Sequence, residues 1–240
     1  MLIVDFDGVV CDALAECALV TWLGGHRDRP WSPGRTELRR VPPSFVRRFR
    51  MIRDYARTLD HFVLAHLPDA QWIRERRDFE RIFRALPRDY VRDFTAAASA
   101  ARRRIREEEP DFWLGMHTLY PGISALLERH SGRVAVVTAK DEESVRDILR
   151  RHGLEHTVTE VVGECADKAG AVRDLCARRR IRPAQAVFVD DSLTNVRRVA
   201  AVGVRARWAT WGYHTPEDLR DGAHPDIHPL DLAEVPDLVV

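Results

Sequence analysis

The 240-residue chain lacks any apolar run close to the ~20 residues that a membrane-spanning helix requires. We also expect no secretory leader, because residues 2–4 already have the character of a core strand and acidic residues follow directly. Its four cysteines fit neither a metal site nor a disulfide framework: Cys11, Cys17, Cys165 and Cys176. We therefore expect a reduced, cytoplasmic protein without a membrane partner.

A strong excess of one charge sign is missing as well. The net charge is +1, which argues against nucleic acid as a partner. The charges are unevenly placed, because residues 12–117 carry +5 and the rest of the chain carries −4. This distribution would suit an anionic small ligand, although solvated helix faces account for most individual arginines.

Lysine is the scarcest basic residue. Of 38 basic residues, 36 are arginine and only Lys140 and Lys168 are lysine. In a chain that otherwise uses arginine, a retained lysine indicates a position where a compact ammonium is needed. Chance could also leave two lysines anywhere, so the motif residues around each lysine are needed to distinguish a functional position from an accidental one.

The pattern of apolar residues predicts two kinds of segment. Residues 2–4 form a short buried strand, whereas residues 12–117 carry apolar side chains at helical spacing. The predicted helical stretches are 44–66, 71–86 and 89–109, and the Gly-, Pro- and Arg-rich stretch 24–43 is predicted to be a loop.

From residue 133 onward, predicted strands alternate with predicted helices. The strands are 133–138, 158–162, 186–189 and 204–208, and the helices are 141–152, 168–180 and 193–202. Such alternation predicts a parallel sheet covered by helices on both faces. The fold class is therefore α/β, with a Rossmann-type core of residues 1–11 and 118–240. An α-helical domain, residues 12–117, is inserted after the first strand.

Polar residues follow the ends of three predicted strands, where the chemistry of an open parallel sheet collects. They are Asp5-Phe6-Asp7-Gly8, Thr138-Ala139-Lys140 and Asp190-Asp191-Ser192, with Asn195 close behind. Lys168 opens a helix, an unfavourable place for a cation unless function requires it. Any one of these residues would be an ordinary turn or cap, but together they predict an active site.

These motifs resemble those of the haloacid dehalogenase (HAD) superfamily. DFDGVV is similar to its first motif, VVTAK to the second, Lys168 to the third and VDDSLTN to the fourth. The PGI at 121–123 and the WGY at 211–213 are similar to the phosphoglycolate-phosphatase-like branch. The resemblance implies a HAD-like core with a substrate-selecting helical cap at residues 12–117.

The resemblance also implies roles for the motif residues. Asp5 would be the nucleophile and Asp7 the acid and base. Mg²⁺ would be held by Asp5, Asp7 and Asp191, because adjacent carboxylates and a phosphate repel one another without a cation. Asp190 and Asn195 would support this metal shell, while Thr138 and Lys168 would bind the phosphoryl group.

Substrate contacts are harder to assign from the sequence. The candidates are Gly8, Ala139, Lys140, His26, Arg27, Arg35, Trp113 and His117. Lys140 is equally compatible with a substrate contact and with a surface position. His26, Arg27 and Arg35 belong to the predicted loop, and Trp113 and His117 lie near the predicted hinge.

The sequence thus predicts a Mg²⁺-dependent phosphatase, a monomer or homodimer, that acts on a small phosphorylated metabolite through an aspartyl-phosphate. Asp7 disfavours dehalogenation, and the absence of lysine from residues 12–117 disfavours carbon–phosphorus cleavage. A phosphomutase of the β-phosphoglucomutase type remains open. A non-catalytic phosphate-binding protein is less favoured, because no nucleophile or metal ligand is lost. Phosphoglycolate, sugar phosphates and nucleoside monophosphates all remain possible substrates.

Overall fold

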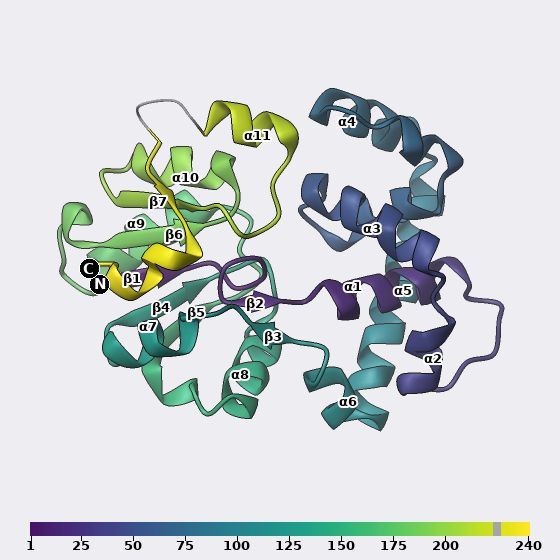
Figure 1. The fold of residues 1–240 in the computed structure, drawn as a ribbon, viewed down its shortest axis with the longest axis horizontal. Helices are drawn as coiled ribbons and strands as arrows, with labels where there is room; N and C mark the ends of the chain where they lie inside the picture. The colour runs from purple at the N-terminus through teal and green to yellow at the C-terminus, as the bar shows by residue number, and fades with distance from the viewer. Residues whose placement is uncertain (223–226) are drawn as a thin grey trace. The chain divides into compact units, whose positions relative to one another are not determined.

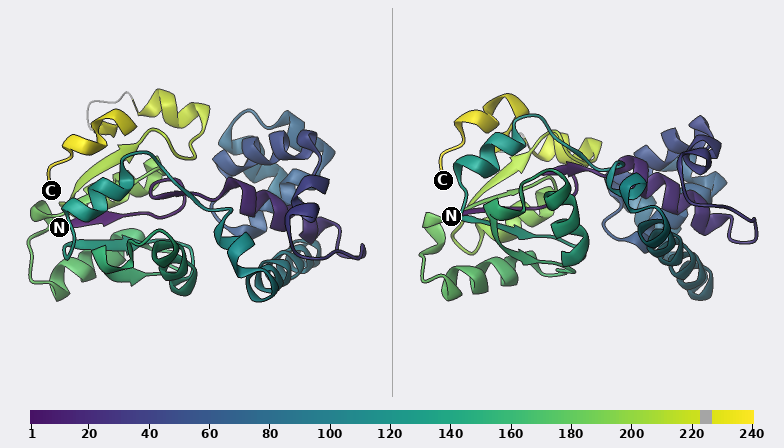
Figure 2. Two further views of the ribbon diagram at one scale, coloured as in Figure 1. Left: turned by 60° about the horizontal axis from the view of Figure 1, so that its bottom comes forward. Right: turned by 90° about the horizontal axis from the view of Figure 1, so that it is seen from below.

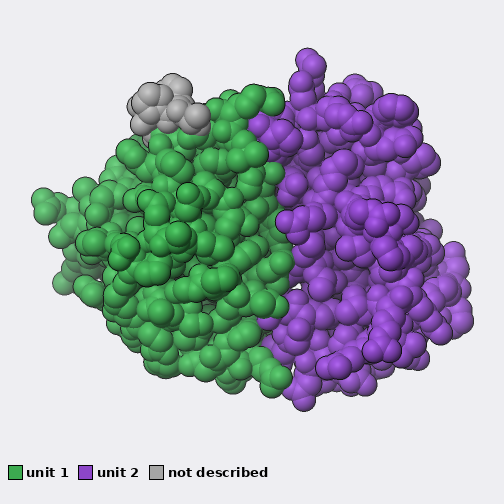
Figure 3. Space-filling model, viewed as in Figure 1, with its two compact units in different colours: residues 1–12, 118–214, 218–240 green, residues 13–117, 215–217 purple. Residues whose placement is uncertain are grey.

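The computed structural model describes residues 1–222 and 227–240. The chain divides into two compact units, shown in different colours in Figure 3. Unit 1 contains residues 1–12, 118–214 and 218–240, and unit 2 contains residues 13–117 and 215–217.

Unit 1 is built on a six-stranded parallel sheet with the strand order β5-β4-β1-β6-β7-β8. The strands are β1 (Leu2–Val4), β4 (Val134–Val137), β5 (Val158–Val162), β6 (Val187–Asp190), β7 (Arg205–Ala209) and β8 (Pro229–Leu230). The central strands are apolar and buried on both faces, which is typical of a parallel sheet covered by helices. The predicted α/β fold is confirmed.

Helices flank this sheet on both sides (Figure 2). They are α7 (Ile123–Arg129), α8 (Glu142–Arg151), α9 (Lys168–Arg178), α10 (Leu193–Ala200) and α11 (Pro216–Asp221), with short 3-10 turns at Glu155–Thr157, Pro183–Gln185 and Leu232–Asp237. Apolar residues of α9 and α10 form one core cluster with Ile3, Phe188 and Trp208 of the sheet. The side chains of Asp141 and Asp167 accept backbone N–H groups at the starts of α8 and α9. These caps fix where the two helices begin.

A two-stranded antiparallel ribbon is formed by the residues that directly precede and directly follow residues 13–117 in the sequence. It pairs β2 (Cys11–Asp12) with β3 (Thr118–Leu119), with Asp12 opposite Thr118. Two residues per strand are too few to leave a periodic signal, which is why the sequence did not reveal this ribbon.

Unit 2 is helical (Figure 1). Its α-helices are α1 (Leu14–Gly25), α2 (Arg35–Arg40), α3 (Pro43–Tyr55), α4 (Arg76–Arg84), α5 (Arg88–Glu108) and α6 (Pro110–Leu114), and its 3-10 helices are η1 (Leu59–His66) and η2 (Pro68–Trp72). The long helix α5 packs against α1. Among the described residues of the whole chain, no helix is both long and apolar enough to cross a membrane.

Three details of unit 2 differ from the sequence-based expectation. The predicted helix 44–66 is interrupted after Tyr55, and its apolar spacing continues in η1, because a 3-10 helix repeats every three residues. The predicted helix 71–86 is divided into η2 and α4. The predicted loop 24–43 contains α2, which is organised by the buried Glu37 and its ion pairs with Arg29 and Arg40. Because ion pairs organise α2, its sequence has no periodic apolar residues from which a helix could be predicted.

Candidate active site

The site lies at the carboxyl edge, by which we mean the last residues of β1, β4, β5 and β6 and the segments that lead from these strands up to the first turn of the next helix. Asp5 follows β1, the strand that lies between β4 and β6. Its Oδ1 accepts the backbone N–H of Phe6 at 2.7 Å, and its Oδ2 lies 2.6 Å from Lys168 Nζ. Both oxygens of this buried carboxylate are therefore oriented by the protein.

Lys168 is the first residue of α9 and its side chain is only 7% exposed. Its Nζ also donates to Asp190 Oδ2 at 2.7 Å. Burial alone would lower the pKa of Lys168, but the carboxylates of Asp190 and Asp5 outweigh burial and raise this pKa. Burial raises the pKa of Asp5, and the Lys168 ammonium opposes that rise. Lys168 therefore stays a cation and favours the ionised form of Asp5.

Asp190, the last residue of β6, is fully buried and is surrounded by protein donors. Its Oδ1 accepts the backbone N–H of Ser192 at 2.7 Å, and Asn195 Nδ2 lies 3.2 Å from each oxygen. Together with the Lys168 bond, these contacts commit the Asp190 carboxylate to holding other residues of the site.

Asp191 is held by Trp208 of β7 and by the segment that follows this strand. The backbone N–H of Tyr213 donates to Asp191 Oδ2 at 2.7 Å, and Trp208 Nε1 donates to the Asp191 carbonyl at 2.9 Å. The Tyr213 hydroxyl in turn donates to Asp12 Oδ1 at 2.8 Å. Trp208 and Tyr213 were not among the predicted site residues, although the WGY at 211–213 marked this segment.

Two glycines leave the space that the Asp191 carboxylate occupies. Gly8 has φ +92°, and a Cβ there would overlap with Asp191 Oδ2. A Cβ on Gly212 would overlap with the side chain of Asp191 and with the Gly8 carbonyl. Gly8 was a candidate substrate contact, and the structure shows a reason within the protein itself for a glycine at this position.

The donor set fits a divalent cation. Carboxylate oxygens of Asp5, Asp190 and Asp191 all lie within 4.8 Å of one another. Such a cluster of hard oxygen donors suits Mg²⁺ or a similar ion, and the mutual repulsion of the carboxylates favours one.

Asp7 and Lys140 form a second ion pair at the carboxyl edge. Lys140 Nζ lies 3.3 Å from Asp7 Oδ2, and the side chains are 7% and 19% exposed. Asp7 Oδ1 is buried and accepts no hydrogen bond from the described residues. Thr138 is buried, and its hydroxyl accepts the backbone N–H of Lys140 at 3.3 Å. Lys140 is thus not a surface residue, whereas its neighbour Ala139 is exposed.

The structure places the remaining candidates in unit 2. The His26 ring lies against the Trp22 ring at a tilt of 33°, and His26 Nδ1 lies 2.8 Å from the Trp22 carbonyl oxygen. Arg27 lies 3.8 Å from Asp93 at an exposed position, and Arg35 is exposed at the start of α2.

Trp113 and His117, the two candidates near the predicted hinge, are both 2% exposed. His117 Nδ1 lies 2.9 Å from the Trp113 carbonyl oxygen, and the Trp113 ring packs under the guanidinium of Arg106. Their contacts are those of core residues of unit 2. Substrate contact by any of the five candidates in unit 2 stays a prediction.

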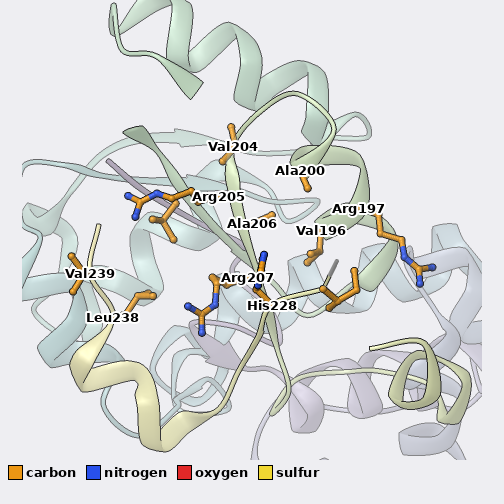
Figure 4. Close-up of a pocket in the computed structure, with 12 residues that line it drawn as sticks. Val196, Arg197, Ala200, Val204, Arg205, Ala206, Arg207, His228, Leu238 and Val239 are labelled. Carbon is orange, nitrogen blue, oxygen red and sulfur yellow. The ribbon is translucent and has the colours of Figure 1, made fainter. Parts of the chain in front are cut away.

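A cavity of about 760 Å³ lies away from the carboxyl edge, at the amino ends of β6 and β7 (Figure 4). Its lining includes Val187, Arg205, Arg207 and Leu238. None of the residues at the carboxyl edge lines this cavity.

Comparison with known proteins agrees with the motif resemblance. The family model described as "Hydrolase: haloacid dehalogenase-like hydrolase" matches residues 1–203. A phosphoglycolate phosphatase of Aliivibrio fischeri is 29% identical over 157 residues, which cover 61% of this chain and 69% of that protein.

Solved structures show the same fold. A predicted phosphoglycolate phosphatase from Haemophilus somnus superposes with a TM-score of 0.65 at 20% identity, covering 98% of this chain and 95% of that one. A putative β-phosphoglucomutase from Thermotoga maritima gives a TM-score of 0.55 at 17% identity, covering 98% and 96%. The predicted family is confirmed: the chain belongs to the haloacid dehalogenase-like hydrolases, and its similarity to a phosphoglycolate phosphatase supports an enzyme of the phosphatase type.

Proposed function

We propose that this enzyme hydrolyses a small phosphomonoester through an aspartyl-phosphate on Asp5, with Mg²⁺ as its divalent ion. The observation that carries the proposal is the buried Asp5 carboxylate at the end of the central strand β1, 2.6 Å from Lys168 Nζ. A carboxylate in this setting is oriented and shielded from bulk water, and the Lys168 ammonium favours the ionised form that a nucleophile needs.

In the first step, an oxygen of Asp5 attacks phosphorus and the bond to the leaving alcohol oxygen breaks. The Lys168 ammonium offsets negative charge on Asp5 and on the phosphoryl group, and the Thr138 hydroxyl donates to a phosphoryl oxygen. Asp7 gives its proton to the leaving oxygen. Its buried Oδ1, which accepts no hydrogen bond from the described residues, supports this role.

In the second step, water attacks phosphorus, Asp7 takes a proton from that water, and the Asp5–phosphate bond breaks. The products are inorganic phosphate and the original Asp5 carboxylate, so the cycle closes. Asp190 and Asn195 keep Lys168 in position through both steps.

The divalent ion would be held by the Asp5 carboxylate, the Asp7 backbone carbonyl and Asp191. Bound there, it would supply positive charge that favours ionised Asp5 and allows a phosphate dianion to approach three carboxylates. The raised pKa of Asp5 in the protein alone supports the need for such a charge.

The relative from Aliivibrio fischeri is a phosphoglycolate phosphatase, so phosphoglycolate is the first substrate to test. Sugar phosphates and nucleoside monophosphates belong in the same panel. A phosphomutase would share the nucleophile but would return the phosphoryl group to a sugar phosphate. Release of inorganic phosphate in proportion to substrate consumed separates the two activities.

The decisive experiment compares wild-type protein with Asp5→Asn on this panel in the presence of Mg²⁺. We expect phosphate release to fall by at least ~10³-fold, because the amide is a poor nucleophile of almost the same shape. Circular dichroism and the melting temperature should show that the variant is folded. Near-wild-type turnover by folded Asp5→Asn would reject the covalent mechanism.

A further inference from the structure

Lys140 is held in place by its backbone as well as by its side chain. Its N–H donates to the Thr138 hydroxyl, and its carbonyl accepts the N–H of Glu164 at 3.0 Å. A Cβ on Gly163 would lie 2.9 Å from that carbonyl, so the turn after β5 packs closely against it. The next residue, Asp141, caps α8. Lys140 is thus preorganised at the carboxyl edge.

The two lysines of the chain contact different carboxylates of the carboxyl edge. Lys168 contacts Asp5 and Asp190, the side of the nucleophile. Lys140 contacts Asp7, the residue that exchanges a proton with the leaving oxygen in the proposed mechanism. One ammonium therefore lies beside the phosphoryl group and the other beside the leaving group.

The distance limits what Lys140 can reach. The leaving oxygen must come within hydrogen-bond distance of Asp7, and Lys140 Nζ is 3.3 Å from an oxygen of that carboxylate. Groups on the first carbons of the leaving alcohol therefore come close to the ammonium. The Lys140 side chain is only 7% exposed, so water screens its charge weakly there.

We propose that Lys140 is a specificity-determining residue, which favours phosphomonoesters whose leaving alcohol carries an anionic group on its first or second carbon. This inference rests on the proposed function, because it uses the leaving-group side that Asp7 defines. A carboxylate and a second phosphate share the required chemistry.

The test uses a series of small substrates that differ in one group. 2-Phosphoglycolate carries a carboxylate, and ethane-1,2-diyl bisphosphate carries a second phosphate. 2-Hydroxyethyl phosphate is a neutral analogue of similar size, and O-phosphoethanolamine carries a cation. Phosphate release gives kcat and KM for wild type, Lys140→Met and Lys140→Arg.

We expect Lys140→Met to lower kcat/KM for at least one anionic substrate by roughly 30-fold or more, mainly through KM, with a much smaller loss for the neutral analogue. Lys140→Arg should restore part of the preference. The matched control is Arg146→Met on α8, which removes a cation that pairs with Glu142 within its own helix and should preserve the preference. The anionic substrate that loses most identifies the group as carboxylate or phosphate.

Equal losses on all four substrates would overturn the inference, because they would show that Lys140 acts only by positioning Asp7. No loss on any of them would overturn it too. Calorimetric binding of 2-phosphoglycolate, ethane-1,2-diyl bisphosphate and 2-hydroxyethyl phosphate to Asp5→Asn, with and without Lys140→Met, tests the same preference without turnover. Failure of the proposed function, seen as absent turnover in wild type, is thereby distinguished from failure of the Lys140 assignment.

Discussion

Asp190 and Asp191 are adjacent in the chain, yet their carboxylates have different partners. Asp190 binds Lys168, Ser192 and Asn195, whereas Asp191 accepts the N–H of Tyr213. The contacts of Asp190 favour a role in holding Lys168, which leaves Asp191 as the proposed side-chain ligand of the metal in this motif.

We therefore predict that Asp191→Asn raises the Mg²⁺ concentration needed for half-maximal activity by about 10-fold or more. Asp190→Asn should shift that concentration less and lower the maximal rate more, because it loosens Lys168. A magnesium titration of both variants, each checked by circular dichroism, measures the two effects. The opposite ranking would exchange the two assignments.

The sequence was sufficient to place the motif residues at one edge of the sheet, because strand ends are read from short apolar runs. Asp5, Lys168 and Asp190 then proved to be in contact. It was not sufficient for Tyr213, whose role depends on a chain return from β7 that no local pattern encodes. The environment of Lys140 was likewise undetermined, since it depends on a side-chain contact with Asp7 across 133 residues.

Among the elements, the buried strands of unit 1 were predictable because each is a short, continuous apolar run between turn residues. The breaks within unit 2 were not, because the apolar spacing of α3 continues through η1 with only a small change of period. Which helical type a segment adopts is decided here by tertiary packing.

The end of η1 shows such packing, and it gives a pH-dependent prediction. His66 Nε2 lies 2.8 Å from the Thr21 carbonyl oxygen, and a Cβ on Gly25 would overlap with the imidazole ring. Burial lowers the pKa of His66 to about 4, against 6.5 for the free side chain. As the pH falls, His66 is therefore protonated at a higher pH in the unfolded chain than in the folded protein.

The contribution of His66 is fully present above pH 6.5 and is lost progressively as the pH falls toward 4. The loss is about 3 kcal/mol, an upper value for a side chain that is partly exposed to water. We predict that His66→Gln, which keeps a donor for Thr21 but does not titrate, flattens the pH dependence in this range. Urea unfolding of both proteins at several pH values measures it, and parallel pH profiles would contradict the assignment.

At the scale of the whole molecule, residues 13–117 enter and leave unit 1 through a single antiparallel ribbon. Asp12 lies opposite Thr118, and the core cluster that includes Ile3, Phe188 and Trp208 contains residues of unit 1 alone. This core of the α/β sheet is therefore formed without the inserted residues, even though β1 is separated from β4 in the sequence by residues 13–117.

We predict that replacing residues 13–117 by Asn-Gly, a sequence suited to a two-residue hairpin turn, gives a protein that still unfolds cooperatively. It should retain slow, Asp5-dependent hydrolysis of a small aryl phosphate. Thermal circular dichroism and phosphate release measure these properties, with the same replacement carrying Asp5→Asn as the control. A shortened chain without a cooperative transition would show that unit 1 depends on unit 2 for folding.

The scarcity of lysine has a practical consequence for labelling. Both lysine amines lie at the carboxyl edge, and no lysine occurs anywhere else in the sequence. A lysine-selective acylating reagent therefore has no decoy lysines on the remaining surface, which carries its positive charge on arginine. Both side chains are only 7% exposed and ion-paired, so acylation is expected to be slow. Any lysine adduct that forms reports on this edge, and a ligand that binds there is expected to lower the yield of that adduct.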